Sequence, residues 1–577
     1  MGSLATIVTT PHPRSPLNEL TSERRRRLTH RALPALCGLS GLALLAGALV
    51  GAGVISGQER VARDFTAAWQ SGDLRAMHAL LSEDAQRAYP LKRFERVYRR
   101  AAATATATGV TSAEPTGERN GGVVVPMQVR TRVFGRVPGE LVIPVSEDRV
   151  NWEPQMVFPG LRSGERLTRG IELPERAKLL SRNGRVLAEG PAGQRSSPLV
   201  GIADSIAGSM EPEETAEERR ALYAQGFPRD LPVGQSGLEE AFEERLRGRP
   251  GGELIAGGRR VLARTRPRAA PAVRTTISPR LQEAAVVGLA GRLGGIAALD
   301  PRNGEILAIA GIAFSGPQPP GSTFKIVTTT AALEQRLVKP SEEFPVESAA
   351  TIDGVELENA NGEFCGGSFR ESFAHSCNSV FAPLGVEVGA EALVDAAERY
   401  GWNGEPVVPG EVPSTLPPAS EIVSPLEVGS TAIGQFKTLA TPLQMASVAQ
   451  VIADGGVRHL PTFGLGEHSE PFRVTTRRVA RTIGSLMVGV VKYGTGTAAA
   501  VDGVQVAGKT GTAELGDTRD SETGETLPSD PTNTDAWFTA YAPARRPTIA
   551  VGVMFVRAGS GGATAAPAAR VVLDEAL

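Results

Sequence analysis

The sequence is short of the residues on which several common enzyme classes depend. Its 577 residues include only three cysteines and six histidines, and no Cys/His spacing matches a zinc site. No Gly-x-Ser-x-Gly motif is present, which argues against the nucleophile elbow of α/β-hydrolases. The net charge of −2 and the pI of about 6.4 argue against a nucleic-acid-binding protein. We expect no cofactor and no metal ion.

Lysine is also scarce. Of the 61 basic residues only seven are lysine, and the others are arginine. Arginine stays protonated in proteins, whereas a buried lysine can lose its proton. Lys325 is the only one of the seven with a serine, Ser322, three residues earlier. This pair is therefore the first candidate for a nucleophile and its base.

The residues around this pair predict a helix that begins near Ser322. Pro319 and Pro320 cannot lie inside a helix, and an apolar pattern starts at Phe324. Residues i and i+3 lie on one face of a helix, so the Ser322 hydroxyl and the Lys325 amine are expected within reach of each other. An uncharged Lys325 would accept the serine proton. An isolated Ser-x-x-Lys is also typical of a capped surface helix.

The N-terminal region predicts a membrane anchor. Residues 33–55 carry no charge and are long enough to span a bilayer of about 30 Å. Arginines at 24–27 place the tail, residues 1–32, in the cytoplasm and the rest outside. A cleaved signal peptide is the alternative, but no convincing cleavage site follows. We expect a single-pass protein of the cell membrane whose N-terminus is cytoplasmic.

The remainder divides into three segments. Residues 58–161 combine helical periodicity with strand-like runs, which predicts a small α+β domain. Residues 165–272 are rich in Arg and Glu and form an extended linker domain, with charged, solvated helices expected at 211–220 and 238–246. Residues 273–577 alternate strands and helices in one large domain. The fold class is thus multidomain α+β.

Two further motifs lie in the same large domain as Ser322 and Lys325. Ser376, Cys377 and Asn378 form a Ser-x-Asn motif, and residues 509–512 read Lys-Thr-Gly-Thr. Each motif alone has little weight, since Ser-x-Asn also occurs at residues 181–183. Their order within one domain matters more, because together they supply the parts of an acyl-transfer site.

With these three motifs the chain resembles the class B penicillin-binding proteins, the serine D,D-transpeptidases of cell-wall synthesis. The segment 234–239 (Gly-Gln-Ser-Gly-Leu-Glu) resembles the linker, or dimerisation-like, region of that class. Residues 58–161 are similar to the nuclear-transport-factor-like cone of the methicillin-resistance type. The resemblance implies that residues 273–577 form a penicillin-binding, β-lactamase-like transpeptidase domain with a central antiparallel sheet flanked by helices.

The resemblance also implies roles for the motif residues. Ser322 attacks the carbonyl of the penultimate D-alanine of a stem peptide, and Lys325 takes its proton. Ser376 relays that proton to the leaving group, and Asn378 orients Lys325 and the substrate. Lys509 supplies positive charge. The substrate is bound by Thr510, Gly511 and Thr512. The oxyanion hole is formed by the backbone N–H groups of Ser322 and Thr512.

Cys365 and Cys377 lie 12 residues apart, on the predicted outer side of the membrane. Because that compartment permits disulfides, we hypothesise a bridge that holds the second motif. Two buried thiols are the alternative, since sequence does not give the Cα separation.

Three other functions fit some of the same residues: a serine β-lactamase, a D,D-carboxypeptidase and a non-catalytic β-lactam-binding scaffold. The expected partners are stem peptides on lipid II-derived glycan strands, β-lactams, the membrane and a membrane glycosyltransferase.

Overall fold

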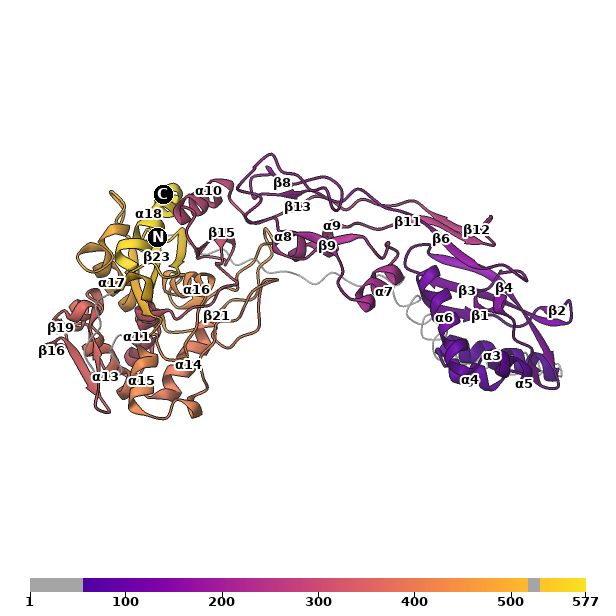
Figure 1. Ribbon diagram of the computed structural model, residues 1–577, viewed down its shortest axis with the longest axis horizontal. Helices are drawn as coiled ribbons and strands as arrows, with labels where there is room; N and C mark the ends of the chain where they lie inside the picture. The colour runs from indigo at the N-terminus through magenta and orange to yellow at the C-terminus, as the bar shows by residue number, and fades with distance from the viewer. Residues whose placement is uncertain (1–55, 517–529) are drawn as a thin grey trace, which may run out of the picture. The chain divides into compact units, whose positions relative to one another are not determined.

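The computed structural model describes residues 56–516 and 530–577, traced in colour in Figure 1. They belong to two compact units, one running to Arg169 and including Leu254–Ala263, the other made of Gly170–Glu253 and Arg264–Leu577. The predicted tail (residues 1–32) and the predicted anchor (residues 33–55) lie outside the described residues. Within the described ranges, no helix is both long and apolar enough to cross a membrane.

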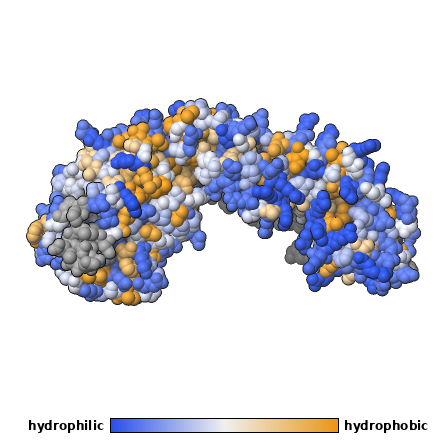
Figure 2. Space-filling model, viewed as in Figure 1, coloured by the Kyte–Doolittle hydropathy of each residue, from blue (hydrophilic) through white to orange (hydrophobic). Residues whose placement is uncertain are grey.

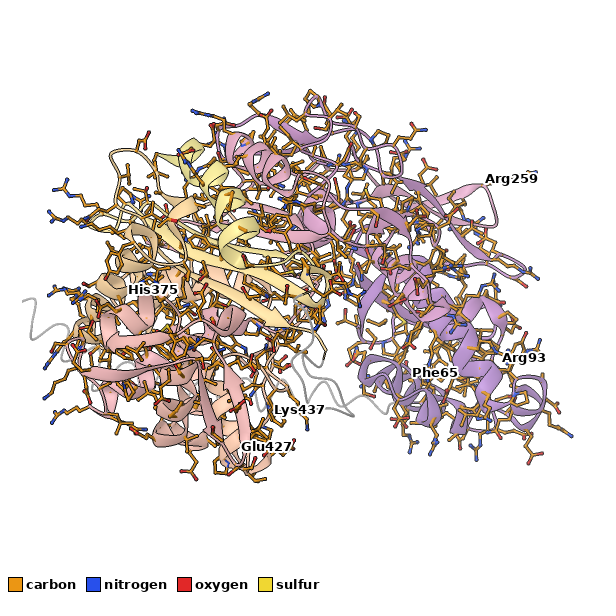
Figure 3. The ribbon with its side chains drawn as sticks, turned by 60° about the vertical axis from the view of Figure 1, so that its left-hand side comes forward. Phe65, Arg93, Arg259, His375, Glu427 and Lys437 are labelled. Carbon is orange, nitrogen blue, oxygen red and sulfur yellow. A yellow bond between two sulfur atoms is a disulfide. The ribbon has the colours of Figure 1, made fainter. Side chains whose placement is uncertain are left out.

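The first unit is an α+β domain in which helices pack on one antiparallel sheet. Its core joins Phe65 of α3 and Phe94 of α6 to Ile143 of β4, and Phe65 is labelled in Figure 3. Trp152 is buried beside them and donates from Nε1 to the Tyr98 hydroxyl at 3.0 Å. The helices are α3 (Gly57–Ser71), α4 (Leu74–Ala79), α5 (Glu83–Ala88) and α6 (Leu91–Ala105). The strands are β1 (Ala107–Ser112), β2 (Gly117–Arg119), β3 (Gly122–Thr131), β4 (Arg136–Ser146) and β5 (Arg149–Val150), in the order β1-β3-β4-β5 with β2 on β3.

The linker segment consists of short strands and three short helices. The helix expected at 211–220 is shifted: Met210–Pro212 form strand β9, and helix α7 (Ala216–Gln225) begins after Thr215. The reason is local, because Thr215 and Glu218 form a capping box that sets the helix start. The other elements are β6 (Leu167–Glu172), β7 (Leu179–Leu180), β8 (Val186–Ala188), β10 (Pro232–Gly234), α8 (Gly237–Ala241), α9 (Glu243–Leu246), β11 (Gly251–Ala256), β12 (Arg260–Thr265) and β13 (Val273–Arg274).

The expectation of solvated helices over 238–246 holds for Glu244 and Arg245 of α9, which are exposed, but not for α8. Glu239 of α8 is 1% exposed and lies between two arginines. Arg176 donates to Glu239 Oε2 at 2.7 Å and to Glu243 Oε2 at 2.7 Å, and Arg195 donates to Glu239 Oε1 at 2.6 Å. These four side chains, called here the arginine–glutamate cluster, neutralise one another inside the second unit.

A five-stranded antiparallel sheet forms the centre of the remaining chain, as expected. Its order is β15 (Ile306–Gly311), β14 (Gly294–Leu299), β24 (Ile549–Phe555), β23 (Thr534–Ala542) and β22 (Ala507–Glu514). The strands are apolar and buried on both faces because helices cover both. Helices α10 (Pro279–Leu289) and α18 (Ala566–Ala576) pack on one face, and α16 (Pro442–Ala453) on the other. Figure 1 shows β23 beside α17 and α18 at the C-terminal end of the chain.

A second group of helices packs beside the β22 edge of the sheet and shares its core. They are α11 (Lys325–Glu334), α12 (Phe369–Ala374), α13 (Asn378–Val388), α14 (Ala390–Tyr400), α15 (Pro425–Ala432) and α17 (Arg477–Lys492). Between α11 and α12 run the short strands β16 (Glu343–Glu347), β17 (Ala349–Ile352), β18 (Val355–Glu358) and β19 (Cys365–Ser368); β20 (Val457–Arg458) and β21 (Phe472–Arg473) form a separate pair. Polar residues cover much of the visible surface, with apolar residues in scattered patches (Figure 2).

Candidate active site

The first motif begins on a turn and not inside an α-helix. Gly321–Phe324 form the 3₁₀ turn η3, and α11 begins at Lys325, three residues later than expected for Ser322. Residues i and i+3 of a 3₁₀ turn eclipse each other, so Ser322 and Lys325 keep a common side. The two side chains were expected within reach of each other, but no hydrogen bond between them is present among the described residues. Instead, the Lys325 amine bonds Ser376 and Asn378.

The turn depends on a glycine immediately before the serine. Gly321 has φ +51°, and its N–H donates to the carbonyl of Gly434 at 2.9 Å. A Cβ at this position would lie 2.8 Å from the carbonyl oxygen of Thr512. Only glycine therefore lets the turn approach strand β22, which carries the third motif.

The Lys325 amine lies at the centre of the site and has no exposed surface. Its Nζ is 2.8 Å from the carbonyl oxygen of Ser376, 2.6 Å from Asn378 Oδ1 and 3.3 Å from Ser376 Oγ. An uncharged amine has two N–H donors and one lone pair. The two shorter contacts use both donors, which leaves the lone pair free to accept a proton from a hydroxyl.

Ser376 of the second motif contacts the Lys325 amine through both its carbonyl oxygen and its hydroxyl. Ser376 has φ +64°, a left-handed conformation that is uncommon outside glycine. In this conformation both its carbonyl oxygen and its hydroxyl lie beside Lys325. Cys377 then caps α13, and Asn378 is the first residue of that helix. Backbone strain of this kind gathers at functional sites.

The third motif lies on β22, which among the described strands of its sheet pairs only with β23. Lys509 is fully buried, and its Nζ donates to Ser376 Oγ at 2.7 Å and to the carbonyl of Thr510 at 3.0 Å. Gly511 passes so close to η3 that a Cβ would lie 2.7 Å from the carbonyl oxygen of Pro320. The glycine of this motif is thus a steric requirement of the contact between strand and turn.

The two lysines share an environment without a counter-charge. Within the part of the chain that the structure describes, neither forms an ion pair with a carboxylate. Burial, and secondarily the charge of Lys509, hold the pKa of Lys325 well below its usual value. Burial lowers the pKa of Lys509 to about 7. The lowered pKa of Lys325 favours the uncharged amine that general-base catalysis requires, and Lys509 lies close to it.

The structure brings all the predicted polar residues of the three motifs to one place, and it adds some that sequence reasoning missed. Thr495 Oγ1 lies 2.5 Å from Thr510 Oγ1. The N–H of Gly561 donates to Thr512 Oγ1 at 3.3 Å. The Gly/Thr-rich run 493–497 was the only local signal for Thr495.

Cys365 and Cys377 form a disulfide, with 5.4 Å between their Cα atoms. The bridge joins strand β19 to the residue that caps α13. It therefore links Cys377, which lies between Ser376 and Asn378, covalently to strand β19.

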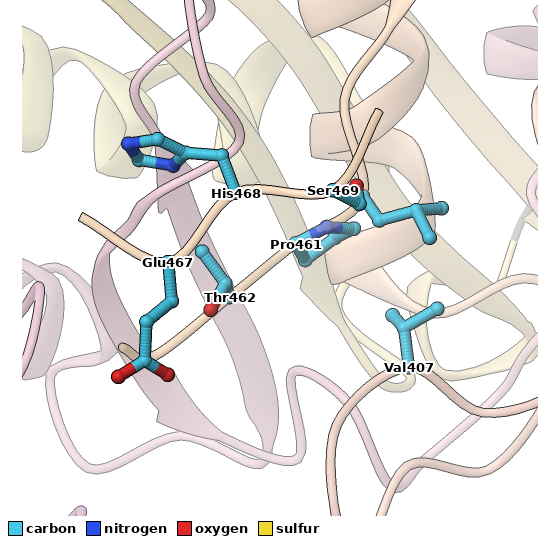
Figure 4. A pocket seen from close by; sticks show the side chains of 7 residues that line it. Val407, Pro461, Thr462, Glu467, His468 and Ser469 are labelled. Carbon is cyan, nitrogen blue, oxygen red and sulfur yellow. The ribbon is translucent and has the colours of Figure 1, made fainter. Parts of the chain in front are cut away.

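Other groups that might suggest chemistry lie apart from the three motifs. His375 is exposed and sits 6.4 Å from the Tyr493 ring, in agreement with a surface position (Figure 3). An open pocket in the second unit includes Val407, Glu467 and His468, but no residue of the three motifs (Figure 4). In the described ranges, no group of three or more His, Cys, Asp or Glu side chains is placed to hold a metal ion.

A serine, two buried lysines and an amide, gathered where η3, α11 and α13 meet strand β22, form a site typical of serine acyl-transfer enzymes. Comparison with protein families agrees: residues 294–574 match the penicillin-binding protein transpeptidase domain, and residues 190–261 match the penicillin-binding protein dimerisation domain. The peptidoglycan D,D-transpeptidase PbpA of Mycobacterium tuberculosis is 33% identical over 379 residues, which are 53% of this chain and 72% of that protein. PbpA of Mycolicibacterium smegmatis is 30% identical over 484 residues, 69% of this chain and 91% of that protein.

Solved structures give the same answer. The penicillin G acyl-enzyme complex of penicillin-binding protein A from M. tuberculosis matches with a TM-score of 0.55 and 27% identity, over 70% of this chain and 99% of that chain. The ceftriaxone acyl-enzyme complex of the same protein matches with a TM-score of 0.55 and 26% identity, over 70% and 98%. The chain belongs to the class B penicillin-binding proteins and is a serine-type peptidoglycan D,D-transpeptidase. The boundaries expected for its domains stay predictions.

Proposed function

We propose that Ser322 is the nucleophile and that Lys325 is its base. Lys325 is buried without a counter-charge, and both of its N–H donors are occupied by Ser376 and Asn378. An uncharged amine held in this way keeps its lone pair for a hydroxyl proton, and Ser322 lies one 3₁₀ turn before it. This is the observation that carries the assignment, because a serine hydroxyl reacts only when a neighbouring base removes its proton.

The reaction then proceeds in two acyl transfers. Ser322 Oγ bonds to the carbonyl carbon of the penultimate D-alanine, and the C–N bond to the terminal D-alanine breaks. The proton taken by Lys325 passes through Ser376 Oγ to the leaving amine. An amine of a neighbouring stem peptide next attacks the ester, which forms the crosslink and releases Ser322. A β-lactam follows only the first half, because its opened ring stays attached to Ser322.

The third motif binds the substrate and stabilises the oxyanion. The free edge of β22 offers backbone groups, and the Thr510 and Thr512 hydroxyls with the Lys509 charge hold the substrate carboxylate. The backbone N–H groups of Ser322 and Thr512 donate to the oxyanion. Losing one donor of this kind costs about 2.7–4 kcal/mol of transition-state stabilisation.

The location of this activity is also a proposal. We propose that residues 33–55 anchor the chain in the cell membrane with the N-terminus in the cytoplasm, and that a membrane glycosyltransferase supplies the glycan strands. The uncharged run and the preceding arginines support the anchor. Fluorescence of a C-terminal reporter that is active only outside the cytoplasm tests the orientation, and a dark reporter contradicts it.

Labelled penicillin tests the nucleophile. Incubation of the full chain, followed by intact-mass analysis and peptide mapping, should place one penicilloyl group on Ser322 and none on Ser322→Ala. An adduct on another side chain would refute the assignment. Rapid multiple turnover of nitrocefin would favour a β-lactamase, and release of D-alanine without crosslinked product would favour a carboxypeptidase. Crosslinking by the Ser322→Ala chain would favour a scaffold.

A further inference from the structure

The start of helix α13 is held by two consecutive residues outside the three motifs, Glu358 and Asn359. The carbonyl oxygen of Glu358 accepts a hydrogen bond from Asn378 Nδ2 at 2.6 Å. Asn359 Oδ1 accepts one from the backbone N–H of Ser379 at 2.9 Å. These contacts come from the end of strand β18, about 20 residues earlier in the chain.

Asn359 does for α13 what an N-cap residue normally does. The first N–H groups of a helix have no partner within the helix, and a side chain usually accepts from one of them. Cys377 occupies the capping position but makes no such bond, since its sulfur is in the disulfide. Asn359 accepts from Ser379, the second residue of the helix, in its place.

The Asn359 side chain is itself held firmly. It is 4% exposed, and its Nδ2 donates to the carbonyl oxygens of Glu347 at 2.8 Å and Glu363 at 2.9 Å. Its own N–H donates to the carbonyl of Ser348 at 2.8 Å. Asn359 thus joins strand β16, the turn before β19 and the start of α13 in one rigid contact.

The orientation of the Asn378 amide follows from this contact. Because Nδ2 of Asn378 donates to the Glu358 carbonyl, Oδ1 must face the opposite side, where Lys325 Nζ lies 2.6 Å away. That contact uses one of the two N–H groups of the uncharged amine and so directs its lone pair. A rotated Asn378 amide would present N–H groups to the amine and lose this control.

We propose that Asn359 is a positioning residue for the acylation of Ser322. It holds Glu358 and the start of α13 in register, so that the Asn378 amide keeps the Lys325 lone pair directed at a hydroxyl. The proposal rests on the assignment of Ser322 and Lys325 made above. Displacement of a catalytic group by about 1 Å can cost about 10²-fold in rate, so the effect of losing Asn359 should be kinetic.

The test is a double-mutant cycle on the full chain in detergent, with a fluorescent penicillin as the probe. Asn359→Ala should lower the second-order acylation rate constant about 10–100-fold. In an Asn378→Ala background the same substitution should change that constant less than about twofold, because the amide through which Asn359 acts is already gone. Asn359→Asp, which keeps the acceptor for the Ser379 N–H, should lie closer to the wild type than Asn359→Ala does.

Gln335→Ala is the matched control. Gln335 Nε2 donates to the carbonyl of Val388 at 3.1 Å, at the opposite end of α13, and its loss should leave the rate within about twofold. Acylation of Asn359→Ala at the wild-type rate would overturn the proposal, and so would an equal fold-loss in both backgrounds, which is what general damage to the fold produces. A wild-type adduct away from Ser322 would refute the proposed nucleophile instead.

Discussion

Two groups of buried charged side chains in the second unit differ in how their charge is balanced. The arginine–glutamate cluster contains two cations and two carboxylates within hydrogen-bond distance of one another. The candidate active site contains two lysines, Lys325 and Lys509, whose polar neighbours in the described chain are hydroxyl, amide and carbonyl groups. Arg176 and Glu239 are buried, as are the two lysines, so the counter-charge is the clearest difference between the buried cations of the two groups.

The consequence is that the pKa values of the buried cations shift in opposite directions. Burial lowers the pKa of Arg176, but hydrogen bonds and charges from Glu243 and Glu239 outweigh that effect and the pKa is raised. For Lys325, burial and the charge of Lys509 act in the same direction and lower the pKa. A carboxylate partner thus favours the charged form of a buried cation, whereas burial without a counter-charge favours the loss of its proton.

The largest effect is expected where the base is made permanently charged. Lys325→Arg keeps a cation at this position but removes the ability to accept the Ser322 proton. The acylation rate constant for a fluorescent penicillin should fall about 10³-fold, within the range of general-base contributions. Lys437→Arg is the matched control, since Lys437 is exposed and contacts only the Phe436 ring among the described side chains. Rapid acylation of Lys325→Arg would show that a different group deprotonates Ser322.

Unbalancing the arginine–glutamate cluster should affect stability instead. Glu239→Gln leaves Arg176 and Arg195 buried with one carboxylate between them, and breaking a buried pair in this way costs about 3–5 kcal/mol. The denaturant transition of the second unit should move accordingly, while the folded fraction keeps its acylation rate. Glu467→Gln, which breaks the exposed pair with Arg245, should cost about 1 kcal/mol or less. Equal costs for both variants would remove burial from the explanation.

The difference between the clusters also separates what the sequence predicted from what it did not. The scarcity of lysine and the three motifs led to Ser322, Lys325 and Lys509, because each of these residues is chemically unusual where it stands. Glu239 was expected on a solvated face because it lies in a charged segment. That expectation was wrong because the partner that lets Glu239 be buried, Arg176, is 63 residues away in the sequence.

The same reason explains why sequence reasoning missed Asn359 and Thr495. Asn359 and Thr495 have no distinctive local pattern, and their roles arise only when β18 meets α13 and when the segment after α17 meets β22. The shift of the α11 start to Lys325 is likewise tertiary, because η3 is held by its contacts with Gly434 and β22. Local chemistry predicted the reacting groups, and long-range packing determined how they are held.

The Cys365–Cys377 disulfide is a covalent, uncharged link, in contrast to the two groups of buried charged side chains. Cys365→Ser should destabilise the second unit by about 3 kcal/mol, the entropic expectation for a closed loop of this length. Because Asn359 also holds the start of α13, the acylation rate should fall less than it does in Asn359→Ala. Denaturant unfolding with and without reductant measures the stability, and reductant should not alter the Cys365→Ser transition. A variant as stable as the wild type would show that the bridge adds nothing to these contacts.

The pH profile of acylation reports on both lysines. The rate rises with pH while Lys325 loses its proton, because only the neutral amine accepts a proton from Ser322. It falls again as Lys509 loses its proton, since that cation holds Ser376 Oγ and attracts the carboxylate of the substrate.

The falling side can be placed, because burial lowers the pKa of Lys509 to about 7. Between pH 7 and pH 9 the rate constant for a fluorescent penicillin should therefore decline about fifty-fold, as the protonated fraction of Lys509 falls from about one half to about one hundredth. Lys509→Arg keeps its charge over this range, so its rate should stay level from pH 7 to pH 9 even if it is lower throughout. A wild-type rate that continues to rise up to pH 9 would mean that Lys509 remains charged there. In that event, burial without a counter-charge would not be sufficient to discharge a lysine in this site.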